Sequence, residues 1–110
     1  MAVSGSSVYG MTKGALLTFN RILAAELAPR KIRVNAVSPG PVRTPLYGKL
    51  GMDNEALAGL TNVLSKKILL NRFAEPGEVA NLVRFLLSDE SSFINGTEQV
   101  IDGGLLVNSL

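Results

Sequence analysis

Apolar residues recur at steps of three and four along the first quarter of the chain. Between residues 9 and 27 they stand at Ala15, Leu16, Phe19, Ile22, Leu23, Ala24 and Leu27. This spacing predicts a helix over residues 9–27. Pro29 predicts the end of the helix, because a proline disfavours the α conformation at the preceding Ala28.

The next segment changes from helical spacing to alternation. From Ile32 to Val37, strongly apolar residues alternate with more polar ones, which predicts a strand over residues 32–37. Ser38-Pro-Gly-Pro41 predicts the end of that strand, and residues 42–52 are expected to form a loop.

Two more helices and a second strand are expected downstream. Asp53 can cap a helix whose C-terminal end carries Lys66 and Lys67, where positive charge is favourable. Pro76 suits a first helical position and predicts a third helix. Gln99-Val-Ile101 is a short apolar run that predicts a second strand.

The order of these elements indicates a fold class. A strand, a helical crossover and another strand place the two strands parallel to each other. Two parallel strands do not make a stable sheet, because parallel sheets are buried on both faces and contain more strands. The sequence therefore predicts an α/β protein and a piece of a larger sheet.

The amino-acid composition excludes several classes of catalytic site. The chain has 110 residues, enough for one domain, and contains neither cysteine nor histidine. This excludes disulfides, a thiolate nucleophile and a histidine-based triad, and we expect no metal site. The formal charge of +2 is too small and too scattered to suggest a nucleic-acid partner.

We expect no membrane span and a cytoplasmic protein. Residues 34–46 form the stretch most worth testing as a span, but they contain three prolines and Arg43. The first seven residues have no basic or apolar leader region. The hydrophobic content of 46% is high for so short a chain, which predicts apolar surface that a partner covers.

Tyr9 and Lys13 are the candidate catalytic pair. They stand four residues apart at the start of the first predicted helix and therefore share one helix face. A nearby cation and the positive end of the helix dipole both favour a phenolate, which could exchange a proton with an alcohol or carbonyl oxygen. Taken alone, a solvated lysine beside a helix-starting tyrosine is the commoner arrangement.

Further segments of the sequence favour a catalytic role for the Tyr9–Lys13 pair. The chain contains, in this order, Tyr9-x-x-x-Lys13, Gly14-Ala-Leu16, Ile32-Arg-Val-Asn-Ala-Val-Ser-Pro-Gly40, Pro41-Val-Arg-Thr44, Arg72-Phe-Ala-Glu-Pro-Gly-Glu-Val79, Asn95-Gly-Thr97 and Asp102-Gly-Gly104. Together they resemble the short-chain dehydrogenases/reductases, in particular the 3-oxoacyl-(acyl carrier protein) reductases. The resemblance runs from about Ser7 to Gly104.

The resemblance implies an oxidoreductase that interconverts an alcohol and a carbonyl with NAD or NADP. Tyr9 takes the position of the family's proton donor and acceptor, and Lys13 that of the lysine that binds the nicotinamide ribose. The loop 38–45 corresponds to the segment under the nicotinamide. Together with Tyr9 and Lys13, its residues expected to bind the cofactor are Pro39, Gly40, Val42 and Thr44.

The remaining segments also have counterparts in the family. The resemblance makes residues 9–27 the catalytic helix, 46–70 a substrate lid, and 75–104 the C-terminal helix and strand. The expected substrate-pocket residues in the lid are Leu46, Tyr47 and Met52, facing a small-molecule alcohol or carbonyl. A homo-oligomer, either a dimer or a tetramer, is the family habit.

Parts of the family pattern are absent. The glycine-rich phosphate loop, the residue that selects NAD or NADP and the catalytic serine have no counterpart in these 110 residues. The resemblance thus implies the C-terminal part of a Rossmann-type doubly wound parallel sheet whose N-terminal strands are missing. The 110 residues by themselves are not expected to form a competent enzyme, and the alternative function is a catalytically incomplete fragment that retains only assembly surfaces.

Overall fold

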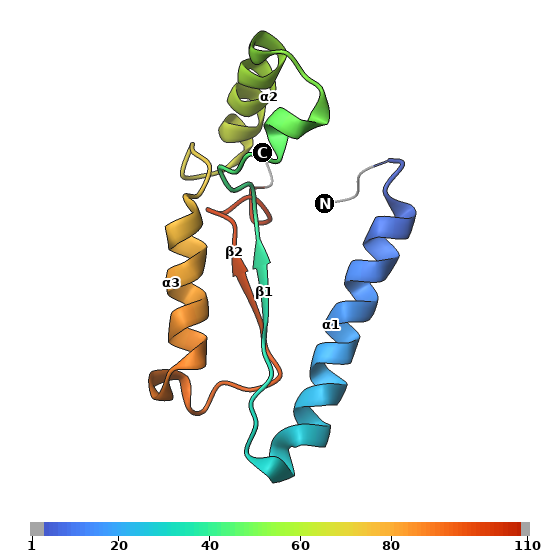
Figure 1. Ribbon diagram of the computed structural model, residues 1–110, viewed down its shortest axis with the longest axis vertical. Helices are drawn as coiled ribbons and strands as arrows, with labels where there is room; N and C mark the ends of the chain where they lie inside the picture. The colour runs from blue at the N-terminus through green and yellow to red at the C-terminus, as the bar shows by residue number, and fades with distance from the viewer. Residues whose placement is uncertain (1–3, 109–110) are drawn as a thin grey trace. The chain divides into compact units, whose positions relative to one another are not determined.

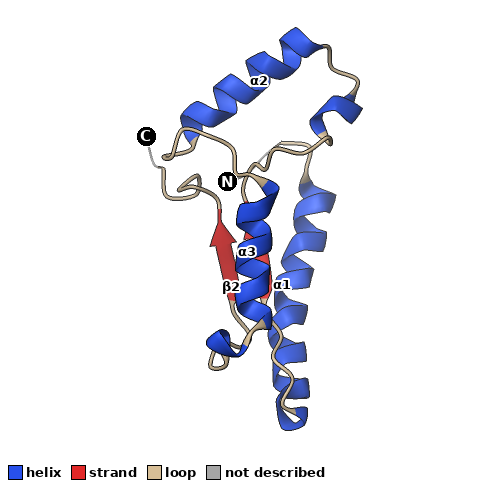
Figure 2. Cartoon of the chain, turned by 60° about the vertical axis from the view of Figure 1, so that its left-hand side comes forward, coloured by secondary structure: helices blue, strands red, loops and turns tan. Residues whose placement is uncertain are grey.

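The computed structural model describes residues 4–108. Its helices and strands, drawn in Figures 1 and 2, are α1 (Ser7–Leu27), β1 (Ala36–Pro39), α2 (Asn54–Lys67), α3 (Pro76–Leu87) and β2 (Glu98–Ile101). Short 3-10 helices occupy Ala28–Arg30, Tyr47–Leu50 and Asp89–Ser91. The structure confirms the α/β class with two parallel strands and three α-helices within these residues.

The strands β1 and β2 pair with each other in one sheet and point the same way (Figure 1). The N–H of Ala36 donates to the carbonyl of Thr97 at 2.9 Å, and that of Gly40 donates to Ile101 at 2.9 Å. Both bonds join residues with the same separation in sequence, so the parallel ladder has no bulge between them.

The prediction of a strand over residues 32–37 was wrong in its bounds. The structure starts β1 at Ala36 and continues it through Ser38 to Pro39. Alternation of apolar and polar residues indicates which side chains are half-buried, but a strand also needs a neighbouring strand to pair with. The partner strand β2 begins only at Glu98, so the pairing does not extend back to Ile32. Pro39 fits at the end of the strand because a carbonyl can still accept there although the N–H is lost.

The expectation that Ala28 leaves the α conformation was also wrong. Ala28 has φ −54° and ψ −41°, and the chain continues from α1 into the 3-10 helix that contains Pro29. Proline is tolerated in the first turn of a helix, where its missing N–H has no helical partner. The turn ends at Lys31, which adopts a left-handed conformation with φ 57°.

The chain divides into two compact units. Unit 1 comprises Met1–Ser38 and Leu82–Gln99, and unit 2 comprises Pro39–Asn81 and Val100–Leu110.

Unit 1 is ordered largely by side chains that bond to the main chain. The guanidinium of Arg33 donates to the carbonyls of Leu86 at 2.8 Å, Ser88 at 3.1 Å and Ile94 at 3.1 Å. The amide of Asn35 donates to Ile94 at 3.0 Å, and its oxygen accepts from the N–H of Thr97 at 3.1 Å. These bonds give Asn35 a structural role in unit 1.

The helix α1 is held in unit 1 through its C-terminal half. Asn20 and Ala24 are buried there, and Asn20 donates to the carbonyl of Thr97 at 3.2 Å. A Cβ placed on Gly96 would lie 3.4 Å from that of Ala24, so the two segments are in close contact.

Unit 2 is built around Ile68 and Phe73, both buried. The preceding helix α2 begins as expected, because the Asp53 carboxylate accepts from the N–H of Ala56 at 2.7 Å. After α2, the chain is joined to the C-terminal turn, since the N–H of Leu70 donates to the carbonyl of Gly103 at 3.1 Å.

The apolar core is small in both units. The buried apolar residues are Ala24, Ile68, Phe73 and Leu86. Several large apolar side chains are exposed in the described residues, among them Phe93 at 103% and Leu87 at 81%. No helix within residues 4–108 is long and apolar enough to cross a membrane.

Gly104 offers a test of the C-terminal turn. It has φ +88°, and an added Cβ would lie 2.8 Å from Cδ1 of Leu69 and 3.0 Å from its Cβ. We expect Gly104→Ala to lower the free energy of unfolding by about 1–3 kcal/mol, through backbone strain and this clash.

Urea denaturation followed by circular dichroism measures the change. The matched control is Gly59→Ala within α2, where a Cβ meets nothing within 4 Å and should stabilise the chain by about 0.5–1 kcal/mol. Equal effects of the two substitutions would contradict the close packing of Gly104 on Leu69.

Candidate functional site

Tyr9 and Lys13 lie on one face of the first turns of α1, in unit 1. The Lys13 Nζ stands 5.4 Å from the centroid of the Tyr9 ring, a cation–π distance. The Tyr9 side chain is 64% exposed, so its hydroxyl is accessible to a small molecule. Neither residue forms an ion pair with any carboxylate among residues 4–108.

Helix geometry fixes the direction of this face. Asn20 follows Tyr9 by three turns and about 20°, and Ala24 follows Lys13 at nearly the same rotation. Because Asn20 and Ala24 are buried in unit 1, Tyr9 and Lys13 project from the same side of α1 that contacts the start of β2. The spacing of these residues along the helix thus determines the direction in which the Tyr9 and Lys13 side chains project.

The candidate cofactor loop begins at the end of β1, in unit 2. Pro39 is the last residue of the strand, and Gly40 continues the ladder by donating to Ile101. A Cβ on Gly40 would come within 2.8 Å of Cα and Cβ of Asp102. Only glycine therefore allows this approach of the two strand ends.

Val42 forms a parallel bridge with Ala74. The N–H of Arg43 donates to the carbonyl of Ala74 at 2.9 Å, and the N–H of Ala74 donates to that of Pro41 at 3.0 Å. In a parallel bridge of this kind, the N–H and C=O of Val42 itself point away from Ala74.

These two groups of Val42 fit a carboxamide. A carboxamide offers two N–H donors and one carbonyl acceptor, so it can pair with one main-chain acceptor and one main-chain donor. Among the described residues, nothing bonds to the N–H or C=O of Val42. Thr44, which lies nearby in sequence, is exposed.

The candidate substrate residues lie before α2, also in unit 2. The ring of Tyr47 stands 5.7 Å from that of Phe73 at an interplanar angle of 49°, which anchors the start of the 3-10 helix 47–50 on the small core. Leu46 is 60% exposed, and Met52 is half-buried.

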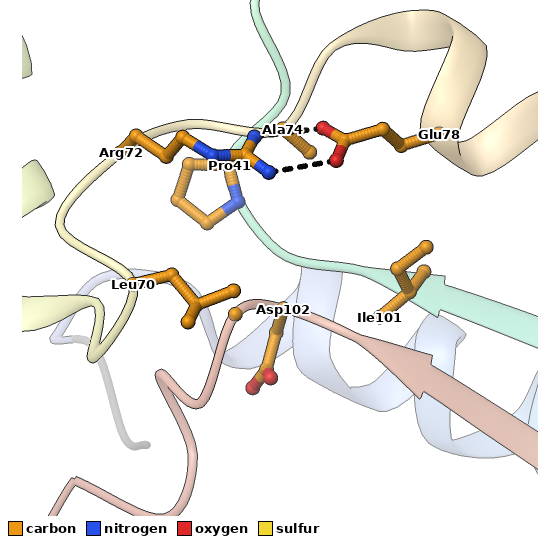
Figure 3. A pocket seen from close by; sticks show the side chains of 8 residues that line it. Pro41, Leu70, Arg72, Ala74, Glu78, Ile101 and Asp102 are labelled. Carbon is orange, nitrogen blue, oxygen red and sulfur yellow. Dashed lines mark hydrogen bonds and ion pairs between the residues drawn. The ribbon is translucent and has the colours of Figure 1, made fainter.

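Beside the cofactor loop lies a small cavity of about 80 Å³ in unit 2. Figure 3 shows its lining residues, which are Pro41, Leu70, Arg72, Ala74, Glu78, Ile101, Asp102 and Gly103. The cavity has room for a few water molecules rather than for a nicotinamide.

Arg72 and Glu78 point toward each other at the edge of this cavity (Figure 3). The two guanidinium nitrogens donate to the two carboxylate oxygens at 2.8 and 2.7 Å, a bidentate pair. Glu78 also accepts from the N–H of Glu75 at 2.8 Å. It is the third residue of α3 and so bonds back to the residue before the helix, as in a capping box.

These contacts shift both groups toward their charged forms. The hydrogen bonds from Arg72 and from the main chain of Glu75 lower the pKa of Glu78 to about 2. The hydrogen bond and charge of Glu78 raise the pKa of Arg72. Because the side chains are 51% and 41% exposed, solvent and salt weaken this effect.

Known proteins resemble this chain along nearly its whole length. A family model described as enoyl-(acyl carrier protein) reductase matches residues 1–106. The oxidoreductase UcpA of Escherichia coli K12 is 42% identical over 106 residues, which is 94% of this chain and 40% of that protein. The cyclopentanol dehydrogenase of a Comamonas strain is 42% identical over 107 residues, again 94% and 40%.

A solved structure agrees with these sequences. The aldohexose dehydrogenase of Thermoplasma acidophilum superposes with a TM-score of 0.90 at 32% identity, over 99% of this chain and 44% of that one. This chain belongs to the short-chain dehydrogenase/reductase family.

The family assignment confirms the resemblance drawn from the motifs. The chain spans about 40% of the length of the curated family members it matches. This agrees with the expectation that it corresponds to part of a Rossmann-type family domain. The match includes all the candidate site residues, because they lie within residues 1–106.

The contacts around residues 72–78 were not predicted from the sequence. Besides the Arg72–Glu78 pair, Arg43 Nε lies 3.1 Å from Glu75 Oε1. One local signal was available, since an acidic residue two positions after Pro76 suits a capping box. The partner Arg72 lies six residues before Glu78 and outside any helix, so spacing alone does not indicate it.

The lowered pKa of Glu78 makes a pH-dependent prediction. Since its pKa is depressed in the folded state, the pair stabilises the protein fully above about pH 4.5, and this contribution is lost as pH falls toward about 2. A carbon-13 NMR titration of the Glu78 carboxyl should show the low midpoint at low salt.

The Arg72→Met variant supplies the comparison. Removing the guanidinium should move the Glu78 titration up toward the ordinary glutamate range, and added salt should do the same in part. A midpoint that is ordinary in the unaltered protein would contradict the bidentate pair.

Proposed function

We propose that this chain supplies the proton-transfer and nicotinamide-side elements of an NAD(P)-dependent oxidoreductase that interconverts an alcohol and a carbonyl. The observation that carries the proposal is the Tyr9–Lys13 pair, with Lys13 Nζ 5.4 Å from the Tyr9 ring on one face of α1. Its membership of the short-chain dehydrogenase/reductase family supports the same reaction class.

In this proposal Tyr9 exchanges the proton. Its hydroxyl gives a proton to the carbonyl oxygen during reduction and takes one from the alcohol during oxidation. The positive charge of Lys13 stabilises the phenolate that is left, and its ammonium group donates hydrogen bonds to ribose hydroxyls. When bound, the nicotinamide supplies or accepts the hydride.

Residues 38–45 are assigned to the cofactor. The outward N–H and C=O of Val42 orient the carboxamide, and the Thr44 hydroxyl adds a bond on the same side. Pro39 and Gly40 end the strand and bring the loop to the carboxyl end of β1, where ligands bind in open α/β sheets. Either NAD or NADP meets these requirements.

Residues 46–70 are assigned to the substrate side. Tyr47, Leu46 and Met52 precede α2 and present one aromatic and two apolar side chains to a small alcohol or carbonyl compound. The names cyclopentanol dehydrogenase and aldohexose dehydrogenase, carried by two related proteins, support this substrate class. The exposed Gly59 and Asn62 within α2 suit an element that moves.

Loss of the Tyr9 hydroxyl tests the proposal. With cyclopentanone and either NADH or NADPH, Tyr9→Phe should lower kcat/KM by about 10²- to 10⁴-fold, because the general acid is gone. Coenzyme oxidation at 340 nm gives the rate.

The control for this variant is Thr18→Val, which removes an exposed hydroxyl from the same helix and should leave the rate unchanged. Turnover that survives in Tyr9→Phe would exclude Tyr9 as the proton donor. Absence of turnover in the unaltered chain with both coenzymes would favour the second candidate function.

The second candidate is an assembly piece without catalysis. It is favoured by exposed apolar side chains on α1 away from the Tyr9 face, notably Phe19 at 54% and Ile22 at 52% exposed. Large exposed apolar patches mark protein interfaces. A homo-oligomer, as a dimer or a tetramer, would cover them.

Sedimentation velocity tests this candidate. If α1 forms the contact, Phe19→Asp should weaken self-association by tenfold or more, since it buries a charge in an apolar interface. Glu26→Asp, a change on the same helix that adds no charge, is the control. A monomer at every concentration in the unaltered chain would rule out self-assembly.

A further inference from the structure

The peptide groups of Val42 are positioned from one side only, by the segment that follows α2. The two hydrogen bonds that flank Val42 both end on Ala74, one at its N–H and one at its carbonyl. Whatever fixes Ala74 therefore fixes the direction in which the N–H and C=O of Val42 point.

Ala74 is itself held between two side-chain contacts that converge on its neighbours. Arg72 donates from Nη1 to the carbonyl of Phe73 at 3.1 Å while it binds Glu78. Glu78 accepts from the N–H of Glu75 at 2.8 Å. The Arg72–Glu78 pair thus contacts the main chain on both sides of Ala74. We call this pair, with its two main-chain contacts, the clasp.

We propose that Arg72 and Glu78 are positioning residues for the nicotinamide side of the site, because their clasp across Ala74 sets the orientation of the Val42 peptide groups. This inference rests on the proposed function, in which those groups bind the carboxamide. Neither residue is a catalytic residue, since both act through Ala74.

The geometry, rather than the charge, carries this role. A guanidinium can bind both carboxylate oxygens and one carbonyl at once through its planar fork, which a lysine ammonium cannot reproduce. Arg72 uses the fork in this way, with Nη1 shared between Glu78 and Phe73. Arg72→Lys therefore keeps the charge and removes the clasp.

A purely structural role would have different consequences. If Glu78 only caps α3, loss of its partner would loosen the start of the helix and weaken every ligand of the protein alike. If the clasp positions Val42, the loss falls on ligands that carry a nicotinamide. ADP-ribose, which has the adenosine and pyrophosphate but no nicotinamide, separates the two cases.

The binding experiment compares NADH and ADP-ribose by calorimetric titration. We expect Arg72→Lys to weaken NADH binding about tenfold, the size expected from the loss of one hydrogen bond, and to leave ADP-ribose binding unchanged. The control is Arg84→Lys in α3, where the arginine has no ion pair among the described residues.

Any other result of the titrations would overturn either the inference or the proposed function. Equal weakening of both ligands, or no weakening of either, would overturn the inference and leave the proposed function intact. Absence of NADH binding in the unaltered protein would overturn the proposed function and the inference with it.

Hydrogen exchange supplies a readout that needs no coenzyme. The amides of Arg43 and Ala74 donate the bonds that hold Val42. Arg72→Lys should speed their exchange severalfold while the amides of α2 and the Arg84→Lys control stay unchanged. Unchanged exchange at both amides would show that the clasp does not hold the loop.

Discussion

Asn35 ties together the two segments from which unit 1 is built. Its amide donates to the carbonyl of Ile94, and its oxygen accepts from both the N–H and the hydroxyl of Thr97. Because these bonds lie on both sides of the turn at residues 95–96, they set where β2 starts beside β1. The ladder bond from Ala36 to Thr97 follows directly from that position.

Polar contacts of this kind carry unusual weight because so little apolar surface is buried. In unit 1 the buried apolar side chains are Ala24 and Leu86. Arg33 donates to the carbonyls of Leu86 and Ser88 at the end of α3, where the last carbonyls of a helix have no helical partner, and also to that of Ile94. In unit 2 the turn after Asp102 has a similar role, since its carboxylate accepts from the N–H groups of Gly104 and Leu106.

The sequence predicted what depends on local spacing. The α-helices follow from apolar periodicity and caps, and the Tyr9–Lys13 contact follows from a separation of four residues. The bounds of β1 could not be derived, because pairing depends on where β2 begins, sixty residues away. The Arg72–Glu78 clasp and the outward direction of the Val42 peptide groups could not be predicted, because both arise from contacts made on folding. Every residue type other than proline has the same main-chain N–H and C=O, so the sequence does not indicate which of them stay unpaired.

In the two proposed functions, the single helix α1 has a role in chemistry in one and in assembly in the other. Tyr9 and Lys13 share their face with Asn20 and Ala24, so contact of the C-terminal half with Gly96 and Thr97 orients the N-terminal half without any contact to the pair itself. Phe19 lies about 80° from Tyr9 around the helix and stays exposed. An interface built on Phe19 would therefore stiffen α1 while leaving the Tyr9 hydroxyl accessible. Under both proposals together, self-association would stabilise the orientation of the Tyr9–Lys13 face and would not block it.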